Sequence, residues 1–118
     1  MAAFMVSPAG STQWRLSADE FAERLRERWP DARVEPGVTS TIMARFELDD
    51  ADGYLADDGV TLWVERGDVE QAAELAVWFR EQVPDDVPLE FSDEGLESEV
   101  EVEDGMSAAE LAEAYEAG

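Results

Sequence analysis

Residues 60–83, VTLWVERGDVEQAAELAVWFREQV, contain the clearest change of hydrophobic period in the chain. As far as Glu65, apolar and polar side chains alternate, which is the period of a β-strand with one buried face. Asp68 and Gln71 then form a capping box, and Pro84 follows the segment, so a helix is expected between them. Its apolar residues recur every three or four positions, as on an amphipathic helix: Val69, Ala72, Leu75, Ala76, Phe79 and Val83.

Two further helices are expected, and each begins at a capping box. Ser17 and Glu20 have the spacing at which each side chain reaches the backbone N–H of the other, and Pro30 ends that helix. Ser107 and Glu110 repeat the box close to the C-terminus. A helix of about ten residues is marginal by itself, so this last one is expected to dock on the rest of the protein. The apolar residues at helical spacing are Phe21, Leu25 and Trp29 in the first helix, and Leu111 and Tyr115 in the last.

The segments between the helices have the alternation or composition of strands. The first strand is expected at residues 4–7 or at residues 13–16, and residues 49–59 are expected to be a hairpin loop rich in Asp and Gly. The remaining strands are expected at residues 39–48, 60–65, 89–91 and 96–102.

The resulting order is β-α-β-β-α-β, followed by one more strand and a short helix. This order predicts an α+β fold of the ferredoxin-like, split βαβ kind, an antiparallel sheet with two helices on one face. Residues 1–118 are expected to form a single domain, with residues 97–118 as an acidic extension of one strand and one helix.

The charge of the chain is concentrated in its second part. Residues 1–46 hold six arginines and six acids, whereas residues 47–118 hold 24 acids against Arg66 and Arg80 alone, so the formal charge of −22 belongs to the second part. Such a field repels nucleic acid and anionic membranes and attracts cationic surfaces. Lys, His, Asn and Cys are absent and Ile occurs once, which indicates a GC-rich bacterium, with adaptation to high salt as the competing explanation.

The missing residue types exclude most enzyme chemistry. Without His there is no ordinary general base near neutral pH, and without Lys or Cys there is no Schiff-base lysine, P-loop lysine or thiol nucleophile. The 30 acids guarantee carboxylate pairs, so such pairs indicate nothing. We therefore expect a protein that is not an enzyme and that uses no cofactor.

A loop rich in aspartate offers the only weak candidates for a metal site. Carboxylates suit calcium or magnesium, but an EF-hand register with Gly53 at the turn would place Leu48 and Gly59 at ligand positions. A solvated hairpin loop explains the same residues, and we expect no metal site. The candidate ligands are Asp50, Asp52, Asp57 and Asp58.

Four glutamates alternate along the last predicted strand, so they share one face at roughly 6–7 Å between neighbours. They either protect an exposed sheet edge from pairing with other chains or form a docking strip for a basic partner. The four are Glu97, Glu99, Glu101 and Glu103.

Two tryptophans lie off the expected core. Trp63 alternates to the sheet face away from the helices, and Met43 and Arg45 are expected beside it on the neighbouring strand. Either the C-terminal helix covers this face, or the three side chains form an interface hot spot, such as that of a homodimer. Trp78 projects away from the stripe of its helix and is expected to be exposed, where it would contribute with Trp63 to binding a partner.

These features together predict a cytoplasmic, non-catalytic, acidic module that binds a basic protein surface, such as an inhibitor or immunity protein. One alternative is a homo-oligomeric structural or regulatory protein that uses the open sheet face, and another is a ferredoxin-like sensor of a small molecule or cation. Neither nucleic acid nor membrane is an expected partner, because both are anionic. The N-terminal apolar run is too short for a signal peptide or a membrane span.

Overall fold

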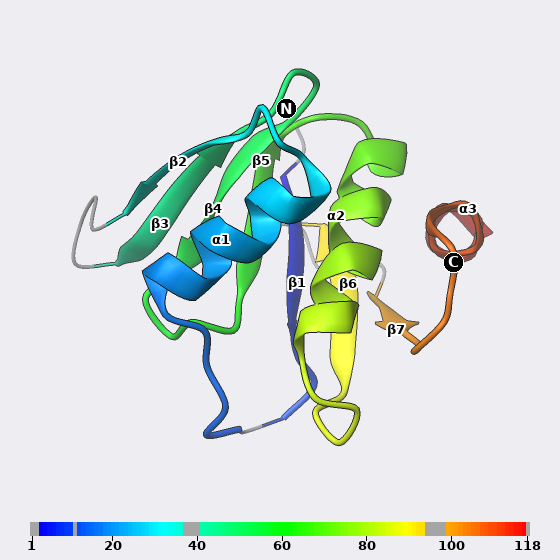
Figure 1. Ribbon diagram of the computed structural model, residues 1–118. Coiled ribbons are helices and arrows are strands. Elements are labelled where there is room, and N and C mark those ends of the chain that lie inside the picture. Colours follow the sequence, from blue (N-terminus) through cyan, green and yellow to red (C-terminus); the bar gives the residue numbers. More distant parts are fainter. Residues whose placement is uncertain (1–2, 11, 37–40, 94–98, 118) are drawn as a thin grey trace.

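One seven-stranded antiparallel sheet carries three helices in the part of the chain that the computed structural model describes, which is residues 3–10, 12–36, 41–93 and 99–117 (Figure 1). The predicted α+β class is therefore confirmed. The strand order is β2-β3-β4-β5-β1-β6-β7. In chain order the elements are β1 (Phe4–Pro8), α1 (Ala18–Arg28), β2 (Arg33–Pro36), β3 (Ile42–Glu47), β4 (Asp52–Ala56), β5 (Leu62–Arg66), α2 (Val69–Gln82), β6 (Leu89–Asp93), β7 (Glu99–Val102) and α3 (Ala108–Ala117).

The strand order differs from the ferredoxin-like arrangement that the sequence predicted. That arrangement needs one hairpin between the two long helices, whereas four consecutive strands, β2 to β5, separate α1 from α2. Strand β1 occupies the first of the two predicted positions, and it pairs antiparallel with both β5 and β6. Because β5 and β6 both run opposite to β1, they are parallel to each other, and α2 connects them across β1.

Strand β4 lies inside the segment that was expected to be a hairpin loop. Asp58 closes the turn after β4, since its Oδ1 accepts hydrogen bonds of 2.9 Å from the backbone N–H groups of Val60 and Thr61. Within β4, Gly53 is required by packing: an added Cβ would lie 1.9 Å from the carbonyl oxygen of Trp63 on β5. The Asp and Gly residues that suggested a loop therefore belong to the turns on either side of β4, except for Gly53, which allows the close contact between β4 and β5.

All three predicted capping boxes are present, and the helices begin where the sequence indicated. Ser17 with Glu20, Asp68 with Gln71, and Ser107 with Glu110 each exchange two side-chain-to-backbone hydrogen bonds. The C-cap residues of the first two helices, Trp29 and Val83, directly precede Pro30 and Pro84. Among the described residues, no helix combines the length and the apolar character needed to cross a membrane.

The three helices cover the same face of the sheet (Figure 1). Phe21 of α1 packs on Phe46 of β3, with ring centroids 5.9 Å apart. Tyr115 of α3 packs edge-on against Phe4 and Phe91 of that face, at 5.7 and 5.4 Å. Helix α3 therefore extends the helix layer beside α2, and the alternative in which it covers Trp63 on the other face is wrong.

The expectation that Trp78 is exposed is also wrong. Only 6% of Trp78 is exposed, and its ring packs edge-on against Phe21 and Trp29 of the first helical segment, at 5.9 and 5.8 Å. Helix α2 lies in the middle of the helix layer, between α1 and α3, so three of its sides are buried rather than one. The sequence stripe identified only the side that faces the sheet.

Arg80 secures the C-terminal end of α2 from inside the protein. It is 4% exposed, and its guanidinium donates hydrogen bonds to the carbonyl oxygens of Val83, Pro84 and Val87. A cation at the end of a helix where carbonyl groups lack helical partners is favourable. One of the two arginines in the acidic part of the chain is therefore used inside the fold, not on its surface.

We expect Trp78→Ala to lower the free energy of unfolding by about 3–5 kcal/mol, because it removes a large buried ring from the contact between α1 and α2. The matched variant Trp63→Ala, on the face without helices, is expected to cost less than about 1.5 kcal/mol. Urea denaturation followed by circular dichroism measures both values. Equal losses for the two variants would contradict the placement of Trp78 in the core.

Candidate functional site: the open sheet face

The sheet face opposite the helices carries one continuous row of side chains across all seven strands. Pairing register places these residues opposite one another from strand to strand. In the described residues no helix lies over this face, which we call the open face. The row runs Glu35, Arg45, Tyr54, Trp63, Met5, Ser92 and Glu99.

The centre of the open face is aromatic. The rings of Tyr54 and Trp63 are stacked, with centroids 6.2 Å apart and an angle of 21° between the planes. Both side chains are partly exposed, and Met5 lies opposite Trp63 on β1. Burial, and secondarily the charge of Glu65, raises the pKa of the Tyr54 hydroxyl above 10.0, although Arg45 acts in the opposite direction. The hydroxyl is therefore protonated and neutral at physiological pH.

Two expected neighbours of Trp63 lie elsewhere. Strand β4 separates β3 from β5, so Tyr54 lies between Arg45 and Trp63, and the Arg45 guanidinium is 5.8 Å from the Tyr54 ring centroid. Met43 packs against the buried core instead of the open face. The pairing of β3 with β4 is irregular between Ile42 and Ala44, and such a bulge breaks the strict alternation on which the prediction relied.

The arginines on the sheet are neutralised by carboxylates of the same protein. Their ion pairs cover the half of the sheet formed by β2 to β5, which therefore presents little net charge. Asp52 accepts a hydrogen bond from the Arg66 guanidinium, and this hydrogen bond together with the negative charge of Asp52 raises the pKa of Arg66. The pairs are Arg33–Glu47 at 3.4 Å, Arg45–Glu65 at 3.0 Å and Arg66–Asp52 at 2.7 Å.

The other end of the open face is acidic and contains no compensating arginine. Strands β1, β6 and β7 have no Arg at all, and we call Glu90, Glu99 and Glu101 on β6 and β7 the acidic end. Glu90 lies opposite Glu101 in the register and shares a hydrogen bond with Glu99. Burial, the hydrogen bond with Glu99 and the charges of both neighbours raise the pKa of Glu90 above its ordinary value of 4.5.

The predicted glutamate row is present in part. Glu99 and Glu101 project from β7, an edge strand, and are exposed, whereas Val102 faces the core and is buried. Glu103 is exposed just beyond the end of β7, and Glu97 lies outside the described residues. Edge protection and partner docking both remain compatible with this position.

The aspartates considered as metal ligands are not brought together. Asp50 and Asp52 lie at one end of β4, whereas Asp57 and Asp58 lie beyond its other end. Asp52 is paired with Arg66, and Asp58 is used by the turn that follows β4. Within the described ranges, no three Asp, Glu, His or Cys side chains are grouped closely enough to hold a metal ion.

Three residues of the open face were missed in the sequence. Tyr54 was hidden because β4 was taken as a loop, and Met5 was unplaced because the partner strands of β1 were unknown. Glu90 is one acid among 30 and gains meaning only from its register opposite Glu101. One feature of the sequence could have indicated a strand at Tyr54: Tyr54 and Leu55 are a large aromatic and a large apolar residue between two segments rich in Asp and Gly.

Comparison with known proteins identifies no relative: the chain matches no protein-family model, no curated protein and no solved structure. A functional conclusion therefore depends on the geometry and charge of the open face. That face combines a stacked aromatic pair, an internally neutralised half and an unneutralised acidic end.

We expect Glu90→Gln to stabilise the protein near pH 7 by about 0.2–1 kcal/mol, the range for cross-strand charge pairs. The raised pKa means that the folded protein holds the Glu90 proton more tightly than the unfolded chain does. The associated stability is complete below the unfolded-state pKa and is lost as pH rises through the folded-state pKa. The advantage of the variant should therefore disappear near pH 3, where Glu90 is protonated in both states.

Urea denaturation at both pH values measures this difference. The control is Glu116→Gln, which removes the same charge from an exposed position on α3. If both variants gain equal stability near neutral pH, the close carboxylate cluster on β6 and β7 does not exist in solution.

Proposed function

We propose that the protein is a non-catalytic binding module whose open face docks a basic surface of another protein. The supporting observation is that the stacked pair Tyr54–Trp63 and the acidic end lie on the same sheet face, over which no helix of the described residues lies. An inhibitor or immunity protein that covers the cationic groove of an enzyme acting on a polyanion is the concrete form of this proposal.

In this proposal, electrostatic attraction raises the association rate of the two proteins. The arginines of β2 to β5 are already paired, so the field of the open face is dominated by Glu90, Glu99 and Glu101. These carboxylates lie close together on one face and repel one another; the charges of Glu99 and Glu101 raise the pKa of Glu90, after its burial and its hydrogen bond with Glu99. A cationic partner relieves that repulsion and also gains from the protein's long-range field at −22 net charge.

In this proposal, the aromatic pair lowers the dissociation rate of the complex. Tryptophan and tyrosine dominate the binding energy of many interfaces when a partner removes them from water. Trp63 and Tyr54 are held in place by their mutual stacking and by the strands beneath them, so little side-chain entropy is lost on binding. Met5 extends the apolar centre beside Trp63, and the charged Arg45 and Glu65 lie next to Tyr54, which resembles a polar rim beside the apolar centre of an interface.

The same face favours binding over catalysis. The chain has no His, Lys or Cys to act as base or nucleophile near neutral pH. Tyr54, the titratable group at the centre, has its pKa moved upward and away from neutrality.

A second copy of this chain is a less favourable occupant of the open face. A two-fold axis across the strands would place the two acidic ends over each other, and an axis parallel to the strands would place the acidic end of one copy over the β2–β3 end of the other. The arginines there, Arg33 and Arg45, are engaged by Glu47 and Glu65 of their own chain. Self-association would therefore have to break these pairs, whereas a basic partner brings its own cations.

We expect the triple variant Glu90→Gln, Glu99→Gln, Glu101→Gln to bind its partner more slowly, by about tenfold in the association rate constant at low salt. A partner captured from a lysate of the source cells on the immobilised wild-type protein is used for the kinetics. The control triple variant Glu70→Gln, Glu113→Gln, Glu116→Gln removes equal charge from the helix layer. Surface plasmon resonance at low salt and at about 0.5 M salt separates steering from contact.

A control variant that slows association as much as the acidic-end variant would contradict the assignment of the docking face. Equal association rates for the wild type and both variants would remove the electrostatic part of the proposal.

We expect Trp63→Ala to raise the dissociation rate constant about 30-fold with little effect on association, because about 2 kcal/mol is typical of an interface hot spot. The control is Trp14→Ala, which truncates an indole packed against the core instead of the open face. An unchanged dissociation rate for Trp63→Ala would place the partner elsewhere on the protein.

Light scattering on the wild type and Trp63→Ala tests whether a second copy of this chain binds the open face. Both are expected to give one species at the monomer mass of 13.1 kDa. A wild-type dimer that Trp63→Ala dissociates would assign the open face to self-association.

A further inference from the structure

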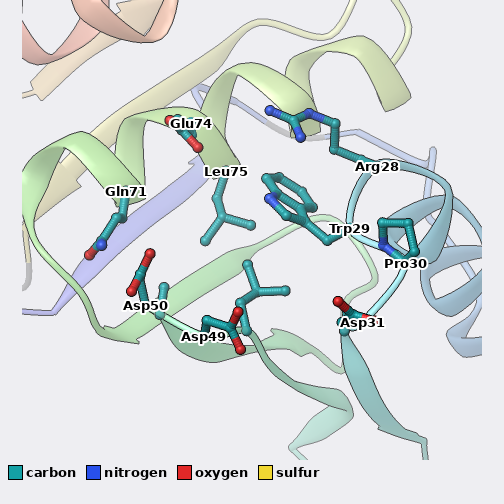
Figure 2. A pocket seen from close by; sticks show the side chains of 12 residues that line it. Arg28, Trp29, Pro30, Asp31, Asp49, Asp50, Gln71, Glu74 and Leu75 are labelled. Atoms are coloured by element: carbon teal, nitrogen blue, oxygen red, sulfur yellow. The ribbon is translucent and has the colours of Figure 1, made fainter.

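A cavity with an aromatic wall lies on the helix side of the protein, away from the open face. Its volume is about 220 Å³, and it is bounded by the C-terminal end of α1, the first half of α2 and the turn between β3 and β4 (Figure 2). The ring of Trp29 and the side chain of Leu75 point into it, and Leu48 completes the apolar wall. A space of this size accommodates one side chain or a small organic molecule.

The ring of Trp29 already binds a cation of its own chain. The guanidinium carbon of Arg28 lies 4.6 Å from the centre of the Trp29 ring, within the range of a cation–π interaction. Trp29 is partly exposed, and its contact with Trp78 in the core is edge-on, with centroids 5.8 Å apart. This contact fixes the ring, while the Arg28 side chain is exposed and free to move away from it.

The rim of the cavity is acidic. Four exposed carboxylates and the single cation Arg28 line it, which gives the lining a net charge of −3. In the described part of the chain, none of these carboxylates is in a salt bridge, unlike those beside the arginines of the sheet. Figure 2 shows them on several sides of the Trp29 ring. They are Asp31, Asp49, Asp50 and Glu74.

We infer that this cavity binds a guanidinium group carried on a short aliphatic chain. The guanidinium takes the position on the Trp29 ring that Arg28 holds in the free protein, and the planar cation stacks on the aromatic face. The aliphatic chain contacts Leu48 and Leu75, and the rim carboxylates pair with the charge. The group is either a free small cation or an arginine side chain of a polypeptide, and both present the same chemistry.

Arg28 acts as an internal competitor in this arrangement, and its removal gives the sharpest test. We expect Arg28→Ala to bind n-butylguanidinium about threefold more tightly than Arg26→Ala, because a cation–π contact accounts for a factor of this size. Both variants remove one exposed arginine from α1, but only Arg28 lines the cavity. Two-dimensional NMR follows the titration through the indole N–H signal of Trp29.

The carboxylates are tested by a second pair of variants. Asp50→Asn with Glu74→Gln is expected to weaken n-butylguanidinium about fivefold, whereas Asp85→Asn with Asp86→Asn, at the far end of α2, should change it less than about twofold. All four side chains are exposed, and the amide spectra verify that each variant is folded.

Two further ligands complete the design. The neutral analogue n-butylurea has the same shape without the charge and should leave the Trp29 signal unchanged. A capped peptide with one arginine has the same charge as n-butylguanidinium, so tighter binding of the peptide assigns the cavity to a protein side chain. Tighter binding of n-butylguanidinium assigns it to a free small cation.

The inference is overturned if n-butylguanidinium leaves the Trp29 signal unmoved in both Arg28→Ala and the wild type. It is equally overturned if the two double variants weaken binding to the same extent, because the attraction would then be the general field of an acidic protein. Neither result bears on the open face, which contains none of these residues.

Discussion

The burial of α2 on three sides is the constraint on which the rest of the structure depends. Phe79 and Ala76 are fully buried toward the sheet, while Trp78 is buried sideways against Phe21 and Trp29. The remaining side is occupied by α3, which packs beside α2 and sends Tyr115 down to Phe4 and Phe91. Because α2 needs a neighbouring helix on each side, all three helices are drawn to one face of the sheet.

The open face is a direct consequence of this one-sided layer. Seven strands are too wide for one helix to cover, so three helices serve one face and none is left for the other in the described residues. Most side chains on that face are at least partly exposed and have to tolerate water, with Ser92 as a buried exception. The sequence satisfies this with ion pairs over β2 to β5 and with glutamates at the β6–β7 end. Tyr54 and Trp63 are the exception, since they expose large apolar rings that ion pairs do not explain.

The helices could be predicted from the sequence because their signals are local. Each capping box lies within four residues, and each stripe repeats within one helix. The strand order could not, because it depends on which strands pair, and β4 is a five-residue strand containing Asp and Gly between two turns. The prediction that Trp78 is exposed was wrong because its burial also depends on contacts between distant elements. An amphipathic pattern identifies the side of a helix that meets a sheet, but not the sides that meet other helices. The acidic end was half predicted, since alternation gave Glu99 and Glu101 but not their partner Glu90 on β6.

The eight arginines explain where an external cation has room to bind. Arg80 is enclosed at the end of α2, and Arg24, Arg33, Arg45 and Arg66 are each paired with a carboxylate. These pairs neutralise the negative charge of the surfaces around them. The negative potential that follows from the net charge of −22 is therefore strongest where no arginine is close to the carboxylates. On the sheet this is the acidic end. Around the cavity, the one arginine present, Arg28, lies on the Trp29 ring and leaves the rim carboxylates free. The same rule therefore selects both sites, although they share no residue and lie on opposite sides of the sheet.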